Sequence, residues 1–524
     1  MTSPIVLVIG CAGATYLFFS ALLHFTQDNK EPPLLETSVP FISPVFGLVS
    51  GTSKYFIKLS LYLQPNRDKY KLPIYTLRVP GQRLYVINSL SLIQPVQRQI
   101  KTIAFAPIEA QAAKGVMGVG PAGNAIIGSD QMFEDDSYLS TFVPSTHPAL
   151  SPGPGLDSIN GDASNFLAKS LADCSAGGPK RVELFAFVRR QLFLATTEAI
   201  YGPKNPLRDP GLEQAWYDFE IGIMAHMLNA WPSLLARKSL HAREKLLIPA
   251  FEKYFAANSH LEGSLLAQCR YNHNTGHGLR GRDLAATEVG QMVASLTNTL
   301  PSAFWLVYRI FSDSVVLNEC RAEVEKLVKI ENGQRTVDLA QVRLSCPTLL
   351  STWQETLRYE HIGIAARVVM KDVMLDNTYL LKKGATVMTA APVQHSDPSL
   401  WGSTVGEFDH RRFIPRPGVK RTSPAAFRSF GGGTVLCPGR HFASTEAMVL
   451  VALMLLRFDV KPATAIGNWE EPRKNFPMTS SIPTPKDEVW VDIVPKDKHG
   501  WRVDFSATSK GVDMVVEDAL PGRA

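Results

Sequence analysis

The segment that decides the fold prediction is Phe430-Gly431-Gly432-Gly433-Thr434-Val435-Leu436-Cys437-Pro438-Gly439-Arg440. Consecutive glycines admit backbone conformations closed to other residues and let a flat ligand approach the main chain. Small and apolar residues over 442–456 predict a buried helix, and Pro438 suits its first turn, where a missing N–H costs nothing. We therefore expect Cys437 near a helix N-terminus, where the dipole and the free N–H groups stabilise a thiolate.

The spacing of Phe430, Gly431, Gly433, Cys437 and Gly439 resembles the haem-binding segment of the cytochrome P450 family. The resemblance implies that these residues bind haem b, with Cys437 as the axial ligand of the iron. For a lone cysteine the alternative is a buried core residue beside a glycine turn. One position departs from the family pattern, since Val435 stands where an Arg or His usually contacts a haem propionate.

Three charged residues are expected to brace the haem-side core. Glu355 and Arg358 lie three residues apart on one predicted helical face, a spacing that in isolation usually means a solvated ion pair. Their place before the cysteine resembles the family's ExxR motif, and Arg412 matches its third member. A buried Glu–Arg–Arg network must be fully paired, because one unpaired charge is costly. Arg367 matches the family's propionate-binding arginine.

Residues 283–311 predict one long helix on the oxygen side of the haem. Pro301 cannot donate to the carbonyl of Thr297 and should kink the helix there. The alternative to a functional groove is a purely structural kink, in which a threonine hydroxyl hydrogen-bonds to a main-chain carbonyl of the preceding turn. The family's acid–threonine pair aligns with Thr297 and Asn298, so Asn298 or Thr299 is expected to hold water for proton delivery. The pattern Asn-Thr-Leu-Pro-x-x-Phe-Trp resembles the sterol-hydroxylase and prostacyclin-synthase subgroup, and the loops resemble fungal members.

The rest of the chain predicts a mainly α fold with small β-sheets. A hairpin is expected over 73–88 around Pro80-Gly81, helices over 180–360 with a loop near 271–282, and short strands over 365–391 and 484–505. The resemblance implies the cytochrome P450 fold, a single large haem domain behind an N-terminal transmembrane helix. The expected divisions are a transmembrane anchor (1–27), a proline-rich linker (28–50), the haem-thiolate catalytic domain (51–510) and a C-terminal tail (511–524).

The N-terminal segment 5–25 carries no charged residue and is long enough to cross a bilayer as a helix. A cleaved signal peptide is less consistent, because no basic residue precedes the apolar run and Leu22-Leu23-His24-Phe25 is a poor cleavage site. We expect a single-pass protein of the endoplasmic reticulum membrane with a cytosolic catalytic domain.

Composition and spacing exclude several other classes of protein. The net charge of +6 is scattered without a long basic run, which argues against a nucleic-acid partner. The 6 cysteines are widely spaced and predict neither a disulfide framework nor a zinc site. Gly118-Val-Gly120-Pro-Ala-Gly123 matches the dinucleotide-binding pattern, but a predicted helix precedes it where that site needs a strand. A loop is the better interpretation.

The predicted function is oxidation of a hydrophobic substrate such as a terpenoid, a sterol or another specialised metabolite, by hydroxylation, desaturation or a related reaction, in specialised-metabolite biosynthesis. Electrons would come from NADPH through a separate reductase, since the stretch after Cys437 is too short for a flavin domain. Two alternatives stay open: a haem-thiolate isomerase that needs neither oxygen nor reductase, and a non-catalytic haem- or steroid-binding protein. Substrate contacts are expected near 105–130, 210–235, 478–482 and the oxygen-side helix.

Overall fold

The computed structural model describes residues 4–35, 39–46, 72–229, 231–332, 334–417, 422–464, 467–477, 479–496 and 501–506. The predicted tail and parts of the predicted linker, as well as Met478, lie outside these residues. The chain forms two compact units, the first of residues 1–108, 362–405 and 425–436, and the second of 109–361, 406–424 and 437–524. The prediction of a mainly helical fold with small sheets is confirmed.

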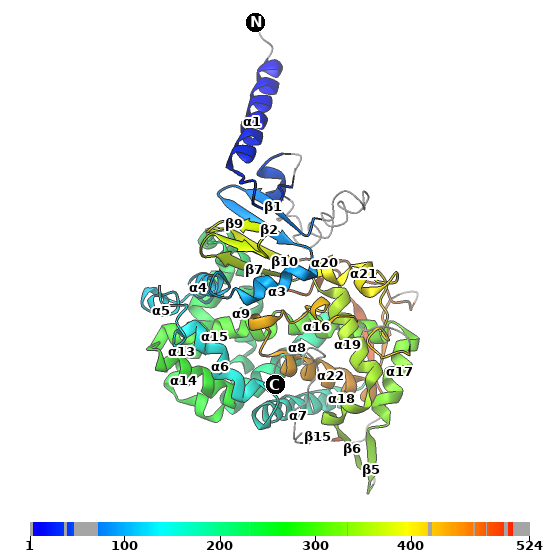
Figure 1. Cartoon of the computed structure of the whole chain (residues 1–524). Helices are drawn as coiled ribbons and strands as arrows, with labels where there is room; N and C mark the ends of the chain where they lie inside the picture. The colour runs from blue at the N-terminus through cyan, green and yellow to red at the C-terminus, as the bar shows by residue number, and fades with distance from the viewer. Residues whose placement is uncertain are drawn as a thin grey trace. The chain divides into compact units, whose positions relative to one another are not determined.

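The first unit is built on a five-stranded sheet with the order β1-β2-β10-β7-β3 (Figure 1). The predicted hairpin is confirmed, with Ile74 opposite Ile87 and Val79 opposite Gln82, and the turn residue Gly81 has a φ of 73°. Its strands and helices are α1 (Pro4–Thr26), β1 (Ile74–Val79), β2 (Gln82–Ile87), α3 (Leu90–Arg98), β3 (Ile103–Ala104), β7 (Ile364–Val369), β8 (Val373–Leu375), β9 (Tyr379–Leu381), β10 (Thr386–Ala390), α20 (Ala391–His395), α21 (Pro398–Trp401) and η8 (Gly433–Val435).

The segment that follows α1 is bound to this sheet, and we call residues 26–35 the N-terminal strap. The carbonyl of Thr26 accepts from Arg83 at 2.8 Å, and the Glu31 carboxylate accepts from the Tyr85 hydroxyl at 2.6 Å. Thr76 of β1 donates its N–H to the Pro33 carbonyl at 2.8 Å, and the N–H of Leu35 donates to the Thr76 carbonyl at 2.9 Å. The strap therefore covers the outer edge of β1.

The second unit is mostly helical. Its longer elements are α6 (Tyr138–Leu150), α7 (Pro154–Ala176), α8 (Leu184–Tyr201), α9 (Pro210–Glu220), α13 (Ile248–Ala256), α14 (Leu265–Gly276), α15 (Gly281–Leu296), α16 (Thr299–Phe311), α17 (Ser314–Glu325), α19 (Pro347–Glu360) and α22 (Arg440–Arg457). Helix α22 packs against α7, α16 and α17, and its buried residues run almost without interruption from His441 to Arg457. Such a helix, buried on nearly all sides, belongs to the core of a large unit.

The shorter elements of the second unit join these helices. They are α4 (Ala106–Ala112, which begins in the first unit), η1 (Ala113–Met117), α5 (Pro121–Ile127), β4 (Lys180–Glu183), η2 (Gly202–Lys204), η3 (Pro206–Arg208), α10 (Ile223–Met227), α11 (Pro232–Leu235), α12 (Arg237–His241), η4 (Ala242–Leu247), η5 (Ser259–Glu262), β5 (Val328–Glu331), β6 (Gln334–Asp338), η6 (Leu339–Gln341), α18 (Val342–Ser345), β11 (Phe458–Pro462), β12 (Lys474–Asn475), β13 (Thr484–Pro485), β14 (Trp490–Pro495) and β15 (Trp501–Asp504). The helix η7 (Pro424–Ala426) lies where the units divide.

Two local predictions were wrong in their boundaries. The expected loop near 271–282 is helical up to Gly276, because α14 carries an N-cap at Ser264 and buries Arg270, His273 and Asn274. The expected helix over 283–311 begins at Gly281, and its interruption at Thr297 and Asn298 lies where the kink was expected.

Helix α1 lies within the segment predicted as an anchor, although the side chains of residues 1–10 and 12 are outside the described part. Among the described residues, no single helix is long and apolar enough to cross a membrane. One bent pair, Gly281–Phe311 followed by Ser314–Glu325 at 104°, meets that criterion by length and composition only.

Candidate functional site

The glycine loop before the cysteine lies in the first unit. Gly431 and Gly433 have φ values of 83° and 63°, a left-handed region that favours glycine. A Cβ atom on Gly431 would lie 2.9 Å from the Val435 carbonyl oxygen, and one on Gly433 would lie 3.0 Å from the side chain of Gln97. Both glycines are thus required by the loop's own turn and by its packing on α3.

Cys437 lies in the second unit, just ahead of α22. Gly439 is the N-cap of this helix, and the Arg440 side chain donates to the Cys437 carbonyl at 3.2 Å. Pro438 precedes the N-cap, so the expectation that it would occupy the first helical turn was wrong. Cys437 is partly exposed, and its position before the N-terminus of a helix suits a thiolate.

The described cysteines in the core have the opposite character. Cys320 and Cys346 are fully buried, and burial raises the pKa of each thiol to about 12. Their thiolates are therefore inaccessible at neutral pH, which leaves Cys437 as the better candidate for an iron ligand.

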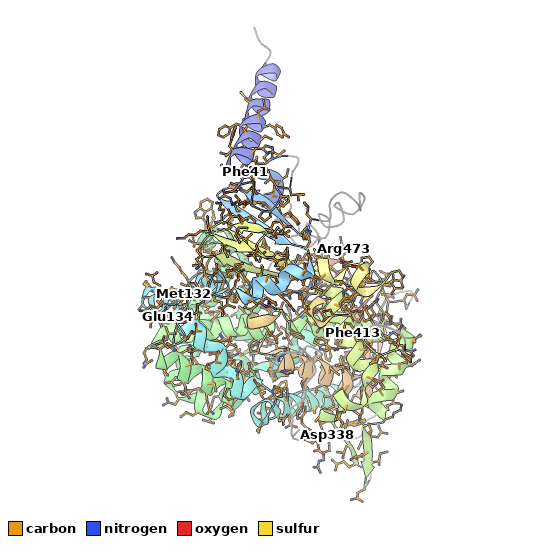
Figure 2. All side chains as sticks on the ribbon, viewed as in Figure 1. Phe41, Met132, Glu134, Asp338, Phe413 and Arg473 are labelled. Atoms are coloured by element: carbon orange, nitrogen blue, oxygen red, sulfur yellow. The ribbon has the colours of Figure 1, made fainter. Side chains whose placement is uncertain are left out.

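The three charged residues predicted to form a network do so in the second unit. The Glu355 carboxylate, which is fully buried, accepts two hydrogen bonds of 2.7 Å from Arg358 and one of 3.0 Å from Nε of Arg412. The N–H of Phe413, labelled in Figure 2, donates to Ser351 Oγ at 3.0 Å and holds the arginine's segment against α19. Every side chain of the Glu–Arg–Arg set therefore has a charged partner.

Arg367 lies on β7 in the first unit and is 6% exposed. Its Nη1 donates to the Ile103 carbonyl at 3.4 Å, and Nη2 has no hydrogen-bond partner among the described residues. Burial without a carboxylate lowers the pKa of this guanidinium. A buried cation with an unpaired donor is costly, so Arg367 fits an anionic ligand such as a haem propionate.

The break in the oxygen-side helix falls between α15 and α16. The N–H of Thr297 still donates to Val293, and the N–H of Ser302 donates to Asn298, each at 3.2 Å. Pro301 has no N–H for the Thr297 carbonyl, as predicted, and Ser480 Oγ lies 3.3 Å from that carbonyl. The Thr297 hydroxyl is buried and has no partner among the described residues.

Asn298 is held by the turn that contains Ser480 and Ser481. Its Oδ1 accepts from the Ser481 N–H at 2.6 Å and lies 3.2 Å from Ser480 Oγ. Because Oδ1 faces two donors, the Asn298 amide nitrogen is left to act as a donor on the other side. Thr299, the first residue of α16, is buried at 7% exposure.

One face of α15 is open although the helix lies in the core. Gln291, Ser295 and Asn298 are half-buried and Ala294 is exposed, whereas Met292, Leu296 and Thr297 on the other faces are buried. The spacing of the open positions is that of one helical face. This face provides room for a ligand beside Thr297 and Asn298.

A sequence model of the cytochrome P450 family matches residues 236–488. The chain is also 34% identical over 511 residues to cytochrome P450 monooxygenase nodJ of Hypoxylon pulicicidum, which covers 93% of this chain and 96% of that protein. The chain belongs to the cytochrome P450 family. Another P450 relative is the cytochrome P450 monooxygenase of Gibberella zeae, 25% identical over 94% of this chain and 93% of that protein. Cytochrome P450 7B1 of Mus musculus is 23% identical over 87% and 90%.

Membership of the P450 family settles the general chemistry. The chain is a haem-thiolate oxidoreductase that uses haem b, receives electrons originating from NADPH through a reductase and acts on a hydrophobic substrate. The relatives from Hypoxylon pulicicidum and Gibberella zeae agree with the expected resemblance to fungal members.

Sequence reasoning missed two features of this site. The clamp of Ser480 and Ser481 on Asn298 lies 182 and 183 residues away along the chain, and no local pattern announces it. The sequence aligned Thr297 with the family's acid but did not show that its hydroxyl is buried without a partner among the described residues. The position of Thr297 at the predicted kink was the sequence signal that could have drawn attention to this side chain.

Proposed function

We propose that this P450 is a monooxygenase in which Cys437 is the axial ligand of the haem iron. The observation that carries the proposal is the placement of partly exposed Cys437 directly before the N-terminus of α22 and after a loop whose glycines have positive φ. When bound, the haem supplies a redox-active iron whose thiolate ligand favours cleavage of the O–O bond of oxygen. Phe430, Gly431, Gly433 and Gly439 would be further haem-binding residues.

Arg367 would bind a haem propionate in place of the basic residue that Val435 replaces. The proposal is supported by the buried, unpaired Nη2 of Arg367 and by the absence of a carboxylate partner for it among the described residues. Glu355, Arg358 and Arg412 would act as a structural brace and would not contact the reacting atoms.

Asn298 and Thr299 would deliver protons to the oxygen side of the haem. Asn298 has its Oδ1 held by the Ser481 N–H, so its amide would present N–H donors to a water molecule on the open face of α15. The neighbouring Thr297 hydroxyl, buried and unpaired, would be a second donor to that water. Such an amide–alcohol pair would transfer protons by orienting water, since neither group ionises near neutral pH.

The substrate would be a hydrophobic molecule with a rigid, polycyclic carbon skeleton, such as a terpenoid or sterol, oxidised in specialised metabolism. The small and weakly polar residues Ala294 and Ser295 on the open face of α15 leave space without offering a charge to bind.

We further propose that the catalytic part faces the cytosol and is held at the endoplasmic reticulum membrane. Residues 1–27 would form the anchor, and Leu17, Phe18 and Phe25 of α1 are 68%, 63% and 90% exposed. Around α10 and α11 the exposed large apolar side chains are Ile221, Leu228, Trp231, Leu234 and Leu235. A patch of this kind is expected to lie against lipid or another protein.

The experiment compares the wild type with Cys437→Ala in the reduced, CO-bound state. Thiolate ligation predicts its characteristic absorption band in the wild type and loss of that band in the variant. Cys174→Ala, a change at another partly exposed cysteine, should leave the band unchanged. The reductase, NADPH and a candidate polycyclic substrate are then combined with and without oxygen. Product formed under strict anaerobiosis would refute monooxygenation and favour an isomerase.

A further inference from the structure

The glycine-rich segment 118–123 encloses a carboxylate of its own chain. The N–H groups of Gly120 and Gly123 donate to the two oxygens of Asp283 at 2.7 and 2.9 Å. Gly120 is the N-cap of α5, and Asp283 lies in the first turn of α15, so α15 caps another helix. The N–H groups that a dinucleotide phosphate would use are therefore already occupied.

Close approach of charged side chains explains the glycines. A Cβ on Gly120 or Gly123 would lie 3.0 or 2.8 Å from the oxygens of Asp283, and one on Gly118 would lie 2.8 Å from Nε of Arg243. Gly118 also has a φ of 78°. The match to the dinucleotide pattern thus results from internal packing.

Two arginines extend the contact made by Asp283. Arg282 donates to the Gly118 carbonyl at 2.7 Å, and Arg243 donates to the Val116 carbonyl at 3.0 Å and to that of Gly115. Glu244 pairs with both arginines. We call Arg243, Glu244, Arg282 and Asp283 the loop latch. It fixes the main chain of 115–123 to the start of α15 and to η4.

The latched loop places Met117 on α15. A Cβ on Gly290 would lie 2.6 Å from Met117 Cε, so the methionine fills the space that this glycine leaves. Positions 290, 294 and 297 follow one another on one side of a helix, and 290 lies two turns, about 10 Å, from 297. Gly290, on which Met117 packs, therefore lies one helical turn before exposed Ala294, on the side of α15 that carries Thr297.

We propose that Asp283 is a positioning residue that holds Met117 over the open face of α15 and so limits the size of the ligand admitted beside Thr297 and Asn298. The inference rests on the proposed function, because the ligand reaches this face next to the haem. Movement of the loop 115–123 away from α15 requires the loss of charge-assisted hydrogen bonds. The loop latch therefore determines which ligand sizes are admitted.

The test uses azoles of different size as probes, because an imidazole nitrogen binds haem iron and shifts its absorption spectrum. Imidazole is compared with clotrimazole in the full-length wild type, Asp283→Asn, Met117→Ala and the double variant. The matched control is Asp313→Asn, since Asp313 accepts from the N–H groups of Val315 and Val316 at the start of α17, away from the loop.

Asp283→Asn should raise the association rate of clotrimazole about tenfold, because the fraction of open molecules limits binding, and change that of imidazole less than about twofold. Met117→Ala should likewise raise the association rate of clotrimazole more than that of imidazole. Adding Asp283→Asn to Met117→Ala should then change little, because both act through one side chain. Amide exchange at Gly120 and Gly123 should accelerate in Asp283→Asn but not in Asp313→Asn.

Equal effects on both azoles, no effect on either, or multiplicative effects in the double variant would overturn the proposal. Should Asp283→Asn fail to fold, Arg282→Ala removes the bond to Gly118 from a side chain that is 41% exposed, and the same comparison with Met117→Ala applies. Absence of the thiolate band in the CO-bound wild type would instead refute the proposed function. An intact band with unchanged size selection refutes the latch alone.

Discussion

The amide oxygen of Asn298 accepts a 2.6 Å hydrogen bond from the N–H of Ser481. This contact determines which end of the amide is directed toward the open face of α15. The Asn298 side chain is therefore oriented by a turn that lies 183 residues further along the chain.

Replacing Asn298 by Leu removes the amide donor and the bond to Ser481. We expect the product formed per NADPH consumed to fall about tenfold, with hydrogen peroxide released instead, because positioned proton donors contribute about that much or more. The measurement is the ratio of product to NADPH with a reductase and an accepted substrate.

Ser481→Ala is the matched control, since it keeps the main-chain N–H that holds Asn298. It should retain the wild-type ratio. Efficient coupling in Asn298→Leu would contradict the assigned role.

Glu355→Gln should destabilise the protein severely. The change leaves the guanidinium groups of Arg358 and Arg412 buried without a full countercharge, a loss of about 3–5 kcal/mol in the free energy of unfolding. Denaturant unfolding measures it. Glu319→Gln is the control, because Glu319 pairs with His410 and Arg411 at a side chain 25% exposed, and it should cost less than about 1 kcal/mol. Equal losses of unfolding free energy in Glu355→Gln and Glu319→Gln would show that burial of the network does not matter.

Arg367→Leu should act in opposite directions on the haem-free and the haem-bound protein. Without haem, removal of a buried, unpaired cation should raise the free energy of unfolding by about 1–2 kcal/mol. With haem, loss of a charge-assisted contact should speed haem release about tenfold, measured as transfer to apomyoglobin. Arg181→Leu, at an exposed arginine paired with Asp492, should change neither. Unchanged haem release would argue against a propionate contact.

The buried ring of His226 should make the fold sensitive to mild acid. Burial, and next the charge of Arg243, lower the pKa of His226 to about 4. Its Nε2 lies 3.0 Å from Ser239 Oγ, which donates to the Phe219 carbonyl, and Nδ1 has no partner among the described residues. These surroundings therefore favour the neutral imidazole of His226 over its protonated form. A second proton on Nδ1 would be buried without an acceptor.

Since this pKa is lower in the folded than in the unfolded chain, its contribution to stability is present above about pH 6.5. It is lost as the pH falls toward about 4, by about 1.4 kcal/mol per pH unit within that window. His226→Gln should flatten this part of the stability–pH curve measured by denaturant unfolding. His241→Gln, at an exposed histidine, should leave the curve unchanged. An equally steep curve for both variants would contradict the assignment.

Features encoded by local spacing could be predicted from the sequence. The hairpin around Gly81 depends on residues within one turn, and the pairing of Glu355 with Arg358 depends on one turn of helix. The position of Cys437 before a helix follows from the change from glycine to apolar residues in a short segment.

Features that join distant segments could not be predicted. Asp283 contacts Gly120 across 163 residues, and a pattern search sees only the glycines without the carboxylate that they surround. The interruption of the long helix at Thr297 was expected from Pro301, but the contact that Ser480 makes with the Thr297 carbonyl could not be predicted. Local patterns specify which residues are chemically suited to a site, but tertiary packing decides what each of them faces.

The N-terminal strap has a consequence for producing a protein without helix α1. Its hydrogen bonds to Thr76 occupy the outer edge of β1, and its Glu31 side chain is buried against Tyr85. Truncation before Gln27 would remove the apolar helix and keep this cover. Truncation that removes Pro33 and Leu35 would instead expose an unpaired strand edge, and an exposed edge invites pairing with a second molecule. The safe cleavage point is therefore set by the sheet rather than by the end of the apolar run.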